Sequence, residues 1–241
     1  MLTLRYHRWL VVLVVCAAVT SLASGAMYTG SLSTDDGGLV GTGPWGDGPS
    51  TLSWTVELLD GPIWEYSYTL EVPAKGISHF ILELSGDFAW ENIESPSMWV
   101  NGQEAPWADV EAEIDDYGPA NPGNPSIPDA LYGIKVDTEE VMGEDGYEDP
   151  LTVTFLFQTM RDPVWGDFYA KSGFDPSSGE WVALWNAGFT DPDMDPFDFP
   201  ADGALDGHLL VPDTTEIPKP ATLALLAFSG MAGVVMRRRG R

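Results

Sequence analysis

The sequence predicts an all-β fold, a single antiparallel β-sandwich or jelly roll, on three observations. Apolar and polar residues alternate along several short segments, these segments are rich in aromatic and β-branched residues, and stretches of Gly, Pro, Asp and Asn separate them. Outside the two ends of the chain, no stretch keeps a helical apolar repeat over three turns. About eight such segments would form one domain of roughly 160 residues, which we place at 27–201.

The clearest predicted element is a hairpin between residues 51 and 72. The segments TLSWTVELL and IWEYSYTLEV each place alternate apolar residues on one face, and Asp60, Gly61 and Pro62 form the turn between them. A third strand, ISHFILELS, spans 77–85. Five further segments are SMWVNG, ALYGIKVD, LTVTFLFQTM, VWGDFYA and WVALWNA. We expect 105–129, which contains five prolines, to be the most irregular part of the domain.

Charge is distributed very unevenly along the chain. The 241 residues include 37 acidic and 11 basic ones, for a formal net charge of −26. All the acidic residues lie in 27–216, together with only four basic residues: Lys75, Lys135, Arg161 and Lys171. Such a surface repels phosphate backbones and anionic lipid headgroups. Nucleic acid is therefore excluded as a partner.

The first 26 residues are typical of a secretion signal. Arg5 and Arg8 precede the apolar run WLVVLVVCAAV, and the small residues SLASGA follow it. We expect cleavage after Ala26, with Gly25 as the second choice. The only cysteine, Cys16, would leave with the signal, so the mature protein has no disulfide and depends on its core, bound ions or partners for stability.

The C-terminal segment 217–241 combines an apolar run with a cluster of arginines. Residues 221–236 carry no charge, and a helix of this length spans only ~24 Å of a hydrocarbon layer that is ~30 Å thick. Arginines at 237, 238, 239 and 241 would keep the end of the chain in the cytoplasm. These features predict a transient membrane anchor, preceded by a polar linker at 202–216; an anchor that is never cut is the alternative.

The segment IPKPATLALLAFSGMAGVVMRRRGR resembles the PEP-CTERM sorting signal of Gram-negative bacteria. Pro218 and Pro220 match the two prolines of its motif, and Lys219 stands where the motif has glutamate. The small-residue-rich apolar helix and the terminal cluster of Arg237, Arg238 and Arg239 complete the resemblance. VPAKGISHFILELS, VWGDFYAKSG and WNAGF resemble a group of PEP-CTERM precursor proteins with no assigned function.

This resemblance implies how the protein is exported. A membrane-embedded exosortase would recognise the tail and cleave it near the motif, after the general secretion machinery has delivered the chain to the inner membrane. The expected destination is the cell surface or the extracellular matrix, where exopolysaccharide is an expected partner.

No catalytic constellation is evident in the sequence. Only His79 and His208 remain after removal of the signal, and a Gly-x-Ser-x-Gly motif is missing. We expect His79 to be a strand residue with a hydrogen-bonded ring, and His208 to lie in the linker. Zinc ligands of the usual types are lacking. Acidic pairs are abundant, but a sequence does not give the carboxylate separation that a glycosidase requires.

One acidic segment, DPDMDPFDFPAD, has the spacing of a calcium-binding loop. Asp191, Asp193 and Asp195 alternate, and Asp202 falls at the twelfth place. Pro196 replaces the glycine of the sixth place, which disfavours an EF-hand. A looser calcium contact and a plain acidic loop remain as the two interpretations. No other cofactor is predicted.

Two functions from different classes fit the sequence. The first is an exported, non-enzymatic protein of the cell surface or exopolysaccharide matrix. The alternative is a secreted β-sandwich that binds or hydrolyses carbohydrate, suggested by ten tryptophans, one of them in the signal. Trp54 and Trp64 lie on the apolar faces of their strands and are expected in the core. The strand pattern does not place the tryptophans at 45, 99, 107, 165, 181 and 185.

Overall fold

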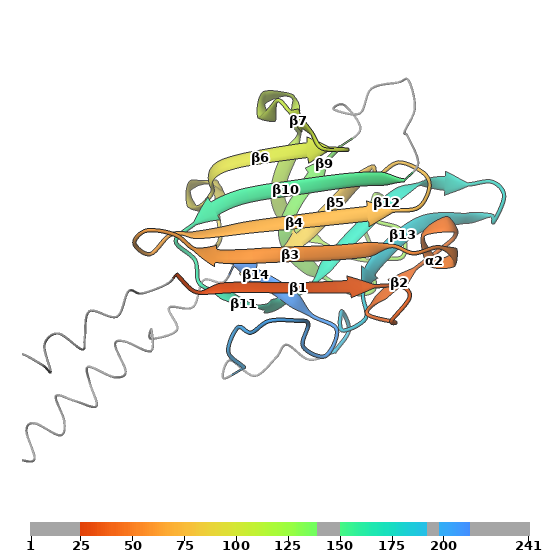
Figure 1. Ribbon diagram of the computed structural model, residues 1–241. Helices are drawn as coiled ribbons and strands as arrows, with labels where there is room; N and C mark the ends of the chain where they lie inside the picture. Colours follow the sequence, from red (N-terminus) through yellow and green to blue (C-terminus); the bar gives the residue numbers. More distant parts are fainter. Residues whose placement is uncertain (1–24, 139–149, 192–197, 213–241) are drawn as a thin grey trace, which may run out of the picture.

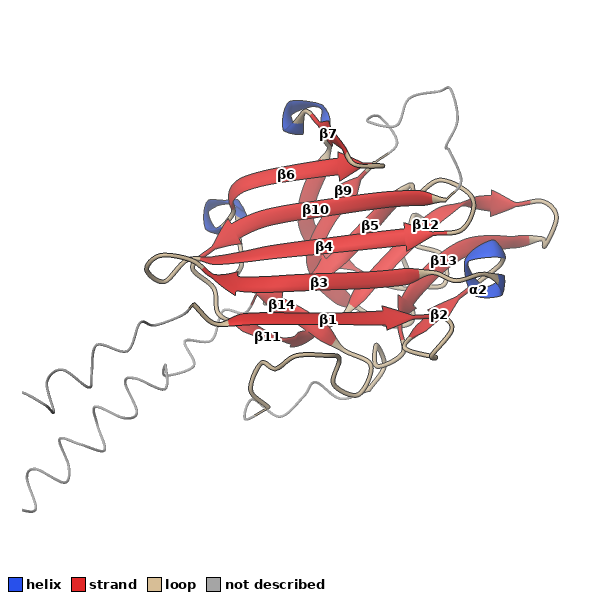
Figure 2. Ribbon diagram, viewed as in Figure 1, coloured by secondary structure: helices blue, strands red, loops and turns tan. Residues whose placement is uncertain are grey.

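The computed structural model describes residues 25–138, 150–191 and 198–212. Within them the chain is built from antiparallel strands, which confirms the all-β prediction, and its helical segments are short turns (Figure 2). Residues 1–24 and 213–241, with the predicted signal and sorting helices, lie outside the described residues. No helix within the described ranges is long and apolar enough to cross a membrane.

Two six-stranded sheets form the two layers of the domain (Figure 1). Sheet 1 has the order β1 (Met27–Ser33), β3 (Thr51–Leu58), β4 (Trp64–Val72), β10 (Leu151–Thr159), β6 (Glu94–Val100) and β7 (Gln103–Ala105). Sheet 2 has the order β2 (Leu39–Gly41), β13 (Glu180–Asn186), β12 (Phe168–Asp175), β5 (His79–Glu83), β9 (Leu131–Asp137) and β8 (Ala112–Tyr117). A small sheet pairs β11 (Pro163–Gly166) with β14 (Leu209–Pro212).

Three short helical turns accompany the strands: α2 (Pro44–Asp47), η1 (Trp90–Asn92) and η2 (Trp107–Asp109).

The predicted hairpin is confirmed as β3 and β4. Trp54 pairs with Tyr68 and Leu52 with Leu70, so the apolar faces of both strands point to the same side of the sheet. Gly61 has a φ of 81°, a conformation that favours glycine and closes the turn. Alternation and turn chemistry thus fix both the pairing and its register.

Aromatic side chains from both sheets fill the space between the layers. Tyr66 of β4 stacks on Phe157 of β10 at 5.5 Å between ring centroids, and both are fully buried. The ring centroids of Phe155 of β10 and Phe80 of β5 lie 5.6 Å apart, and this contact packs sheet 1 against sheet 2. Burial of each such ring contributes roughly 1.5–3 kcal/mol. This filled core stabilises the domain without disulfides.

The outer faces of the two sheets differ in chemistry. On sheet 1 the outward residues of the central strands are mostly Ser and Thr, and Thr69 and Thr154 are hydrogen-bonded across β4 and β10 at 2.9 Å. Sheet 2 instead carries a second apolar cluster on its outer side, in which Ile127 packs with Ile81 and Tyr169. The expectation that 105–129 is the most irregular part is partly wrong, because this stretch supplies β8, η2 and the buried Ile127.

The predicted linker at 202–216 is wrong for residues 202–212. Leu209 and Leu210 are fully buried, and β14 pairs with β11 through Val164 and Val211. The hydroxyl of Tyr68 donates to the carbonyl of Leu210 at 2.8 Å. LLVP does not alternate because every one of its residues is buried, so the two-residue period that identifies a half-exposed strand is missing. Residues 213–216 lie outside the described part.

Candidate functional site

The ring of His79 is buried and hydrogen-bonded, as predicted. Its Nε2 lies 2.8 Å from Oδ1 of Asn124, and its Nδ1 lies 3.6 Å from Oδ1 of Asp137. Burial first, and then the positive charges of Lys171 and Lys135, lower the pKa of His79 to about 3. The ring is therefore neutral at pH 7, and its approach to Asp137 is not an ion pair.

His208 is also buried, in a network that the sequence does not reveal. Its Nδ1 lies 2.9 Å from Oδ1 of Asp167, and the side chain of Asn186 donates to the same oxygen at 2.7 Å. The hydrogen bond with Asp167 raises the pKa of His208. These residues are distant in sequence, so no local pattern could predict the network. The placement of His208 in a linker is wrong, because the residue is 2% exposed.

The Asp167–His208 pair has the geometry of a base and its orienting carboxylate, but the catalytic arrangement is incomplete among the described residues. The Nε2 atom of His208 is buried and has no hydrogen-bond partner there. It faces the backbone of Gly188, where an added Cβ would lie 2.7 Å from it. A nucleophile would have to occupy this side of the ring. The pair joins the residue before β12 to the residue before β14.

The residues of the predicted calcium loop are only partly described. Asp191 is exposed, and Asp193 and Asp195 lie outside the described residues. A carboxylate oxygen of Asp202 accepts a hydrogen bond from the backbone N–H of Thr29 at 2.9 Å, so this side chain is attached to the edge of β1. Within the described ranges, no three His, Cys, Asp or Glu residues form a group that could hold a metal ion.

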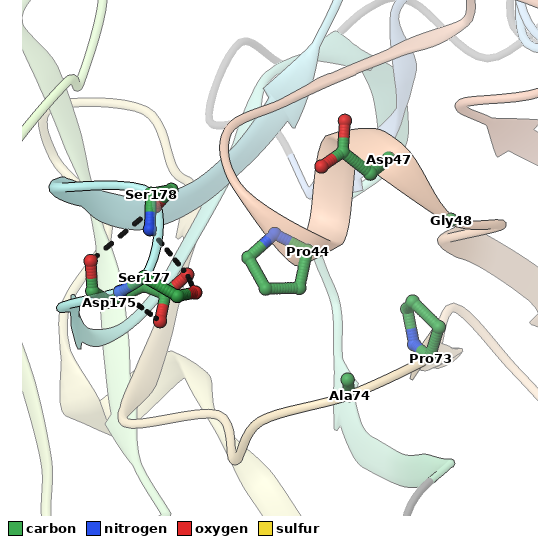
Figure 3. Close-up of a pocket in the computed structure, with 8 residues that line it drawn as sticks. All are labelled: Pro44, Asp47, Gly48, Pro73, Ala74, Asp175, Ser177 and Ser178. Atoms are coloured by element: carbon green, nitrogen blue, oxygen red, sulfur yellow. Dashed lines mark hydrogen bonds between the residues drawn. The ribbon is translucent and has the colours of Figure 1, made fainter.

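An open hollow of about 560 Å³ lies between the β12–β13 turn and the short helix α2. Figure 3 shows Asp175 and Ser177 on one side and Pro44 and Asp47 on the other. The Asp175 carboxylate accepts from the Ser177 hydroxyl at 2.7 Å and from the Lys75 ammonium at 3.0 Å. The Ser177 bond first, and then the Lys75 bond, hold the pKa of Asp175 well below its usual range. This carboxylate therefore stabilises the turn.

The tryptophans divide into three groups by exposure. Trp54 and Trp64 are in the core, as predicted, and Trp45 is also fully buried. Half-buried tryptophans lie at 99, 107, 165 and 185. Trp90 and Trp181 are 43% and 45% exposed. Exposed aromatic rings are the groups through which a β-sandwich can bind a flat apolar ligand surface.

The outer side of the β12–β13 hairpin gathers exposed rings beside one cation. Phe174 and Trp181 lie 5.6 Å apart in an edge-on arrangement, and the Lys171 ammonium lies 5.8 Å from the centre of a Trp181 ring. Trp185 lies on the same side of β13, four residues further along. We name Lys171, Phe174, Trp181 and Trp185 the hairpin face. It is the strongest candidate binding surface among the described residues.

Comparisons with known proteins found no matching family model, no similar curated protein and no similar solved structure.

Proposed function

We propose that this chain is an exported, non-enzymatic protein of the cell surface or exopolysaccharide matrix, sorted by a PEP-CTERM-like signal. The β-domain is the exported part. The general secretion machinery moves it to the inner membrane, which holds the precursor transiently. An exosortase then cleaves the tail near Pro218, Lys219 and Pro220, and the arginines from 237 to 239 remain on the cytoplasmic side.

The position of the folded domain relative to both signals carries this proposal. β1 begins at Met27, immediately after the expected cleavage at Ala26, and β14 ends at Pro212, before the tail that begins at residue 217. Removal of both end segments would leave every core residue in place. Cleavage after Ala26 would remove the backbone hydrogen bond from the N–H of Leu58 to the carbonyl of Ala26, at 2.7 Å, and the packing of the Ala26 side chain at the edge of the core. Processing at both ends is thus compatible with the fold.

The chemistry of the described residues supports a role without catalysis. The layers enclose a filled aromatic core, and Asp175, one of the two carboxylates that line the hollow, is hydrogen-bonded within its own turn. The exposed rings of Phe174 and Trp181 favour the binding part of the alternative function, in which the domain contacts carbohydrate.

The sorting proposal is tested in a Gram-negative host with and without its exosortase. We expect fractionation and C-terminal mass spectrometry to find the protein at the surface without its arginines only when the enzyme is present. Simultaneous replacement of Arg237, Arg238 and Arg239 by Gln should reduce correct retention and cleavage. The matched variant Lys219→Glu restores the acidic centre of the motif and should increase the cleaved fraction. An intact tail on all exported protein would refute the proposal and leave an uncut anchor.

A further inference from the structure

We propose that the hairpin face is a binding platform for a neutral polysaccharide chain. This inference rests on the proposed function, because it gives the exported domain a ligand in the matrix. It goes beyond sorting by naming the surface, Lys171, Phe174, Trp181 and Trp185, and the chemistry of its partner.

The rings of Phe174 and Trp181 are exposed because of their position in the β12–β13 hairpin. Phe174 is 48% exposed and Trp181 is 45% exposed, whereas Tyr169 and Ala183, on the same side of these two strands, are fully buried. The pairing of β12 with β13 shifts register between Lys171 and Phe174, which bends the hairpin at this point. Figure 1 shows the ends of both strands projecting past the rest of sheet 2. Phe174 and Trp181 therefore lie on the part of the β12–β13 hairpin that extends beyond the sheet.

The strand register places the rings in a row. Phe174 is directly opposite Trp181, and Trp185 lies on the same side of β13, opposite Tyr169, which is fully buried; the accessible rings of this face are those of Phe174, Trp181 and the half-buried Trp185. Trp181 and Trp185 are four residues apart on β13, a distance of roughly 13 Å along the strand. An extended ligand that presents several flat apolar surfaces along its length fits this row. A pyranose polymer has this property, because each sugar ring carries a face of C–H groups.

The charges around the rings select a neutral ligand. The outward residues of the two strands from Tyr169 to Trp185 include no carboxylate, in a chain with 37 acidic residues. Asp175 and Glu180 are paired with each other in the register and lie on the opposite side, where Asp175 contacts Lys75. The strongly acidic domain repels polyanions at longer range, which disfavours nucleic acid, anionic membranes and acidic polysaccharides.

Lys171 supplies the polar contact that such a platform needs. Its ammonium lies beside the Trp181 ring and has three donors, which can serve both a hydroxyl of the ligand and existing partners. A second copy of the chain is a weaker candidate occupant. The rings of Phe174 and Trp181 are only about half exposed, and they offer far less area than the roughly 800 Å² per partner of a stable protein interface.

The test uses the purified full-length chain in a mild detergent, so that it does not depend on export or cleavage. The probes are three insoluble neutral glucans, namely cellulose, a β-1,3-glucan and cross-linked dextran, with alginate beads as the anionic comparison. We expect retention on at least one neutral glucan and none on alginate. Trp181→Ala and Phe174→Ala should each weaken binding roughly tenfold or more, because an aromatic anchor is lost.

Two matched variants control for general effects of removing an exposed ring. Trp90→Ala removes an indole of nearly equal exposure, 43%, and Phe199→Ala removes a phenyl ring that is 60% exposed. Both lie outside the hairpin and should leave binding unchanged. Thermal unfolding establishes that each variant is folded. If Trp181→Ala does not fold, oxidation of indole rings in the wild-type protein replaces it: bound glucan should protect Trp181 and leave Trp90 reactive.

Several outcomes would overturn the inference: no retention on any neutral glucan, equal loss with Trp90→Ala, retention on alginate instead, or self-association that depends on Trp181. None of them affects the sorting proposal, which is judged by the C-terminus of the exported protein. Conversely, normal glucan binding without exosortase cleavage would refute the sorting proposal and leave the binding inference intact.

Discussion

The Nδ1 atom of His208 lies 2.9 Å from Oδ1 of Asp167, and this contact fastens the end of the described domain to sheet 2. His208 directly precedes β14, and Asp167 directly precedes β12. Asn186, at the end of β13, donates to Asp167 at 2.7 Å and to the carbonyl of Gly207 at 2.9 Å. Three segments that are distant in sequence are thus held by one buried polar network.

The hydrogen bond between His208 and Asp167 should make the free energy of unfolding decrease as the pH becomes alkaline. Because the hydrogen bond with Asp167 raises the pKa of His208, the folded state holds this proton more tightly than the unfolded state. The stabilisation is complete below the unfolded pKa, about 6.5, and is lost as pH rises through the higher folded value. Urea unfolding between pH 5 and pH 9 should show a steeper alkaline loss in the wild type than in His208→Gln.

The comparison with His208→Gln is essential, because general repulsion among the carboxylates is common to both proteins. Parallel stability curves for the two proteins would contradict a role for the His208 proton.

His79 should have the opposite pH dependence. Burial lowers its pKa to about 3, so the folded state keeps the ring neutral while the unfolded state takes up a proton below about pH 6.5. The stability that His79 contributes is therefore complete above pH 6.5 and is lost as pH falls towards 3. Uptake of one proton on unfolding changes the free energy of unfolding by about 1.4 kcal/mol per pH unit.

His79→Gln keeps a side chain able to hydrogen-bond Asn124 and removes the titration. We expect this variant to be less stable than the wild type at pH 7.5 but to lose less stability on acidification to pH 4, as measured by urea unfolding. An equal acid-induced loss in both proteins would show that other groups account for it.

The sequence predicts those parts of the fold whose signals are local. β3 and β4 alternate and share a turn at Gly61, so their pairing follows from the residues between 51 and 72. β14 has no such signal, because a fully buried strand does not alternate. The network of His208 is not predictable either, since its partners are the residue before β12 and the last residue of β13, which are distant from it in sequence.

The sequence predicts the candidate binding surface only in part. The number of tryptophans indicates a capacity for stacking, but exposure depends on which elements cover each ring. Trp45 is buried although it lies in a short helix, α2, bounded by glycines, whereas Trp181 is exposed although it lies in a strand. The register shift in β12 lies between Lys171 and Phe174, and its one local signal is Gly173, because a glycine inside a strand often marks a bulge.

Truncation should locate the true end of the domain. A chain that ends at Ala201, the boundary predicted from the sequence, lacks Leu209, Leu210 and Val211, which are at most 2% exposed. Loss of three buried aliphatic side chains removes roughly 5–9 kcal/mol, a large part of the stability of a typical domain.

Residues 25–201 should therefore fail to unfold cooperatively, whereas residues 25–212 should give a sharp thermal transition with dispersed amide signals. Equal cooperativity in both fragments would show that β14 is dispensable.

Two buried tryptophans should respond differently to replacement by phenylalanine. Trp45 donates through Nε1 to the carbonyl of Ala74 at 2.7 Å, whereas Nε1 of Trp54 is buried without a partner among the described residues. Both substitutions remove similar apolar area. Trp45→Phe also leaves a carbonyl without its donor, which costs roughly 1–3 kcal/mol, while Trp54→Phe removes a donor that has no partner.

We expect the free energy of unfolding in urea to fall more for Trp45→Phe than for Trp54→Phe, by roughly 1–3 kcal/mol. Gly30→Ala provides an independent probe of the second site, because its Cβ would lie 2.2 Å from the Trp54 ring, and this overlap should destabilise the domain. Combined with Trp54→Phe, the same substitution should be better tolerated but not fully so, since the smaller ring removes the nearest clash while the carbonyl oxygen of Gly203 would still lie 2.8 Å from the Cβ. If the losses in the free energy of unfolding from Gly30→Ala and Trp54→Phe simply add in the double variant, the indole ring does not cause the destabilisation by Gly30→Ala.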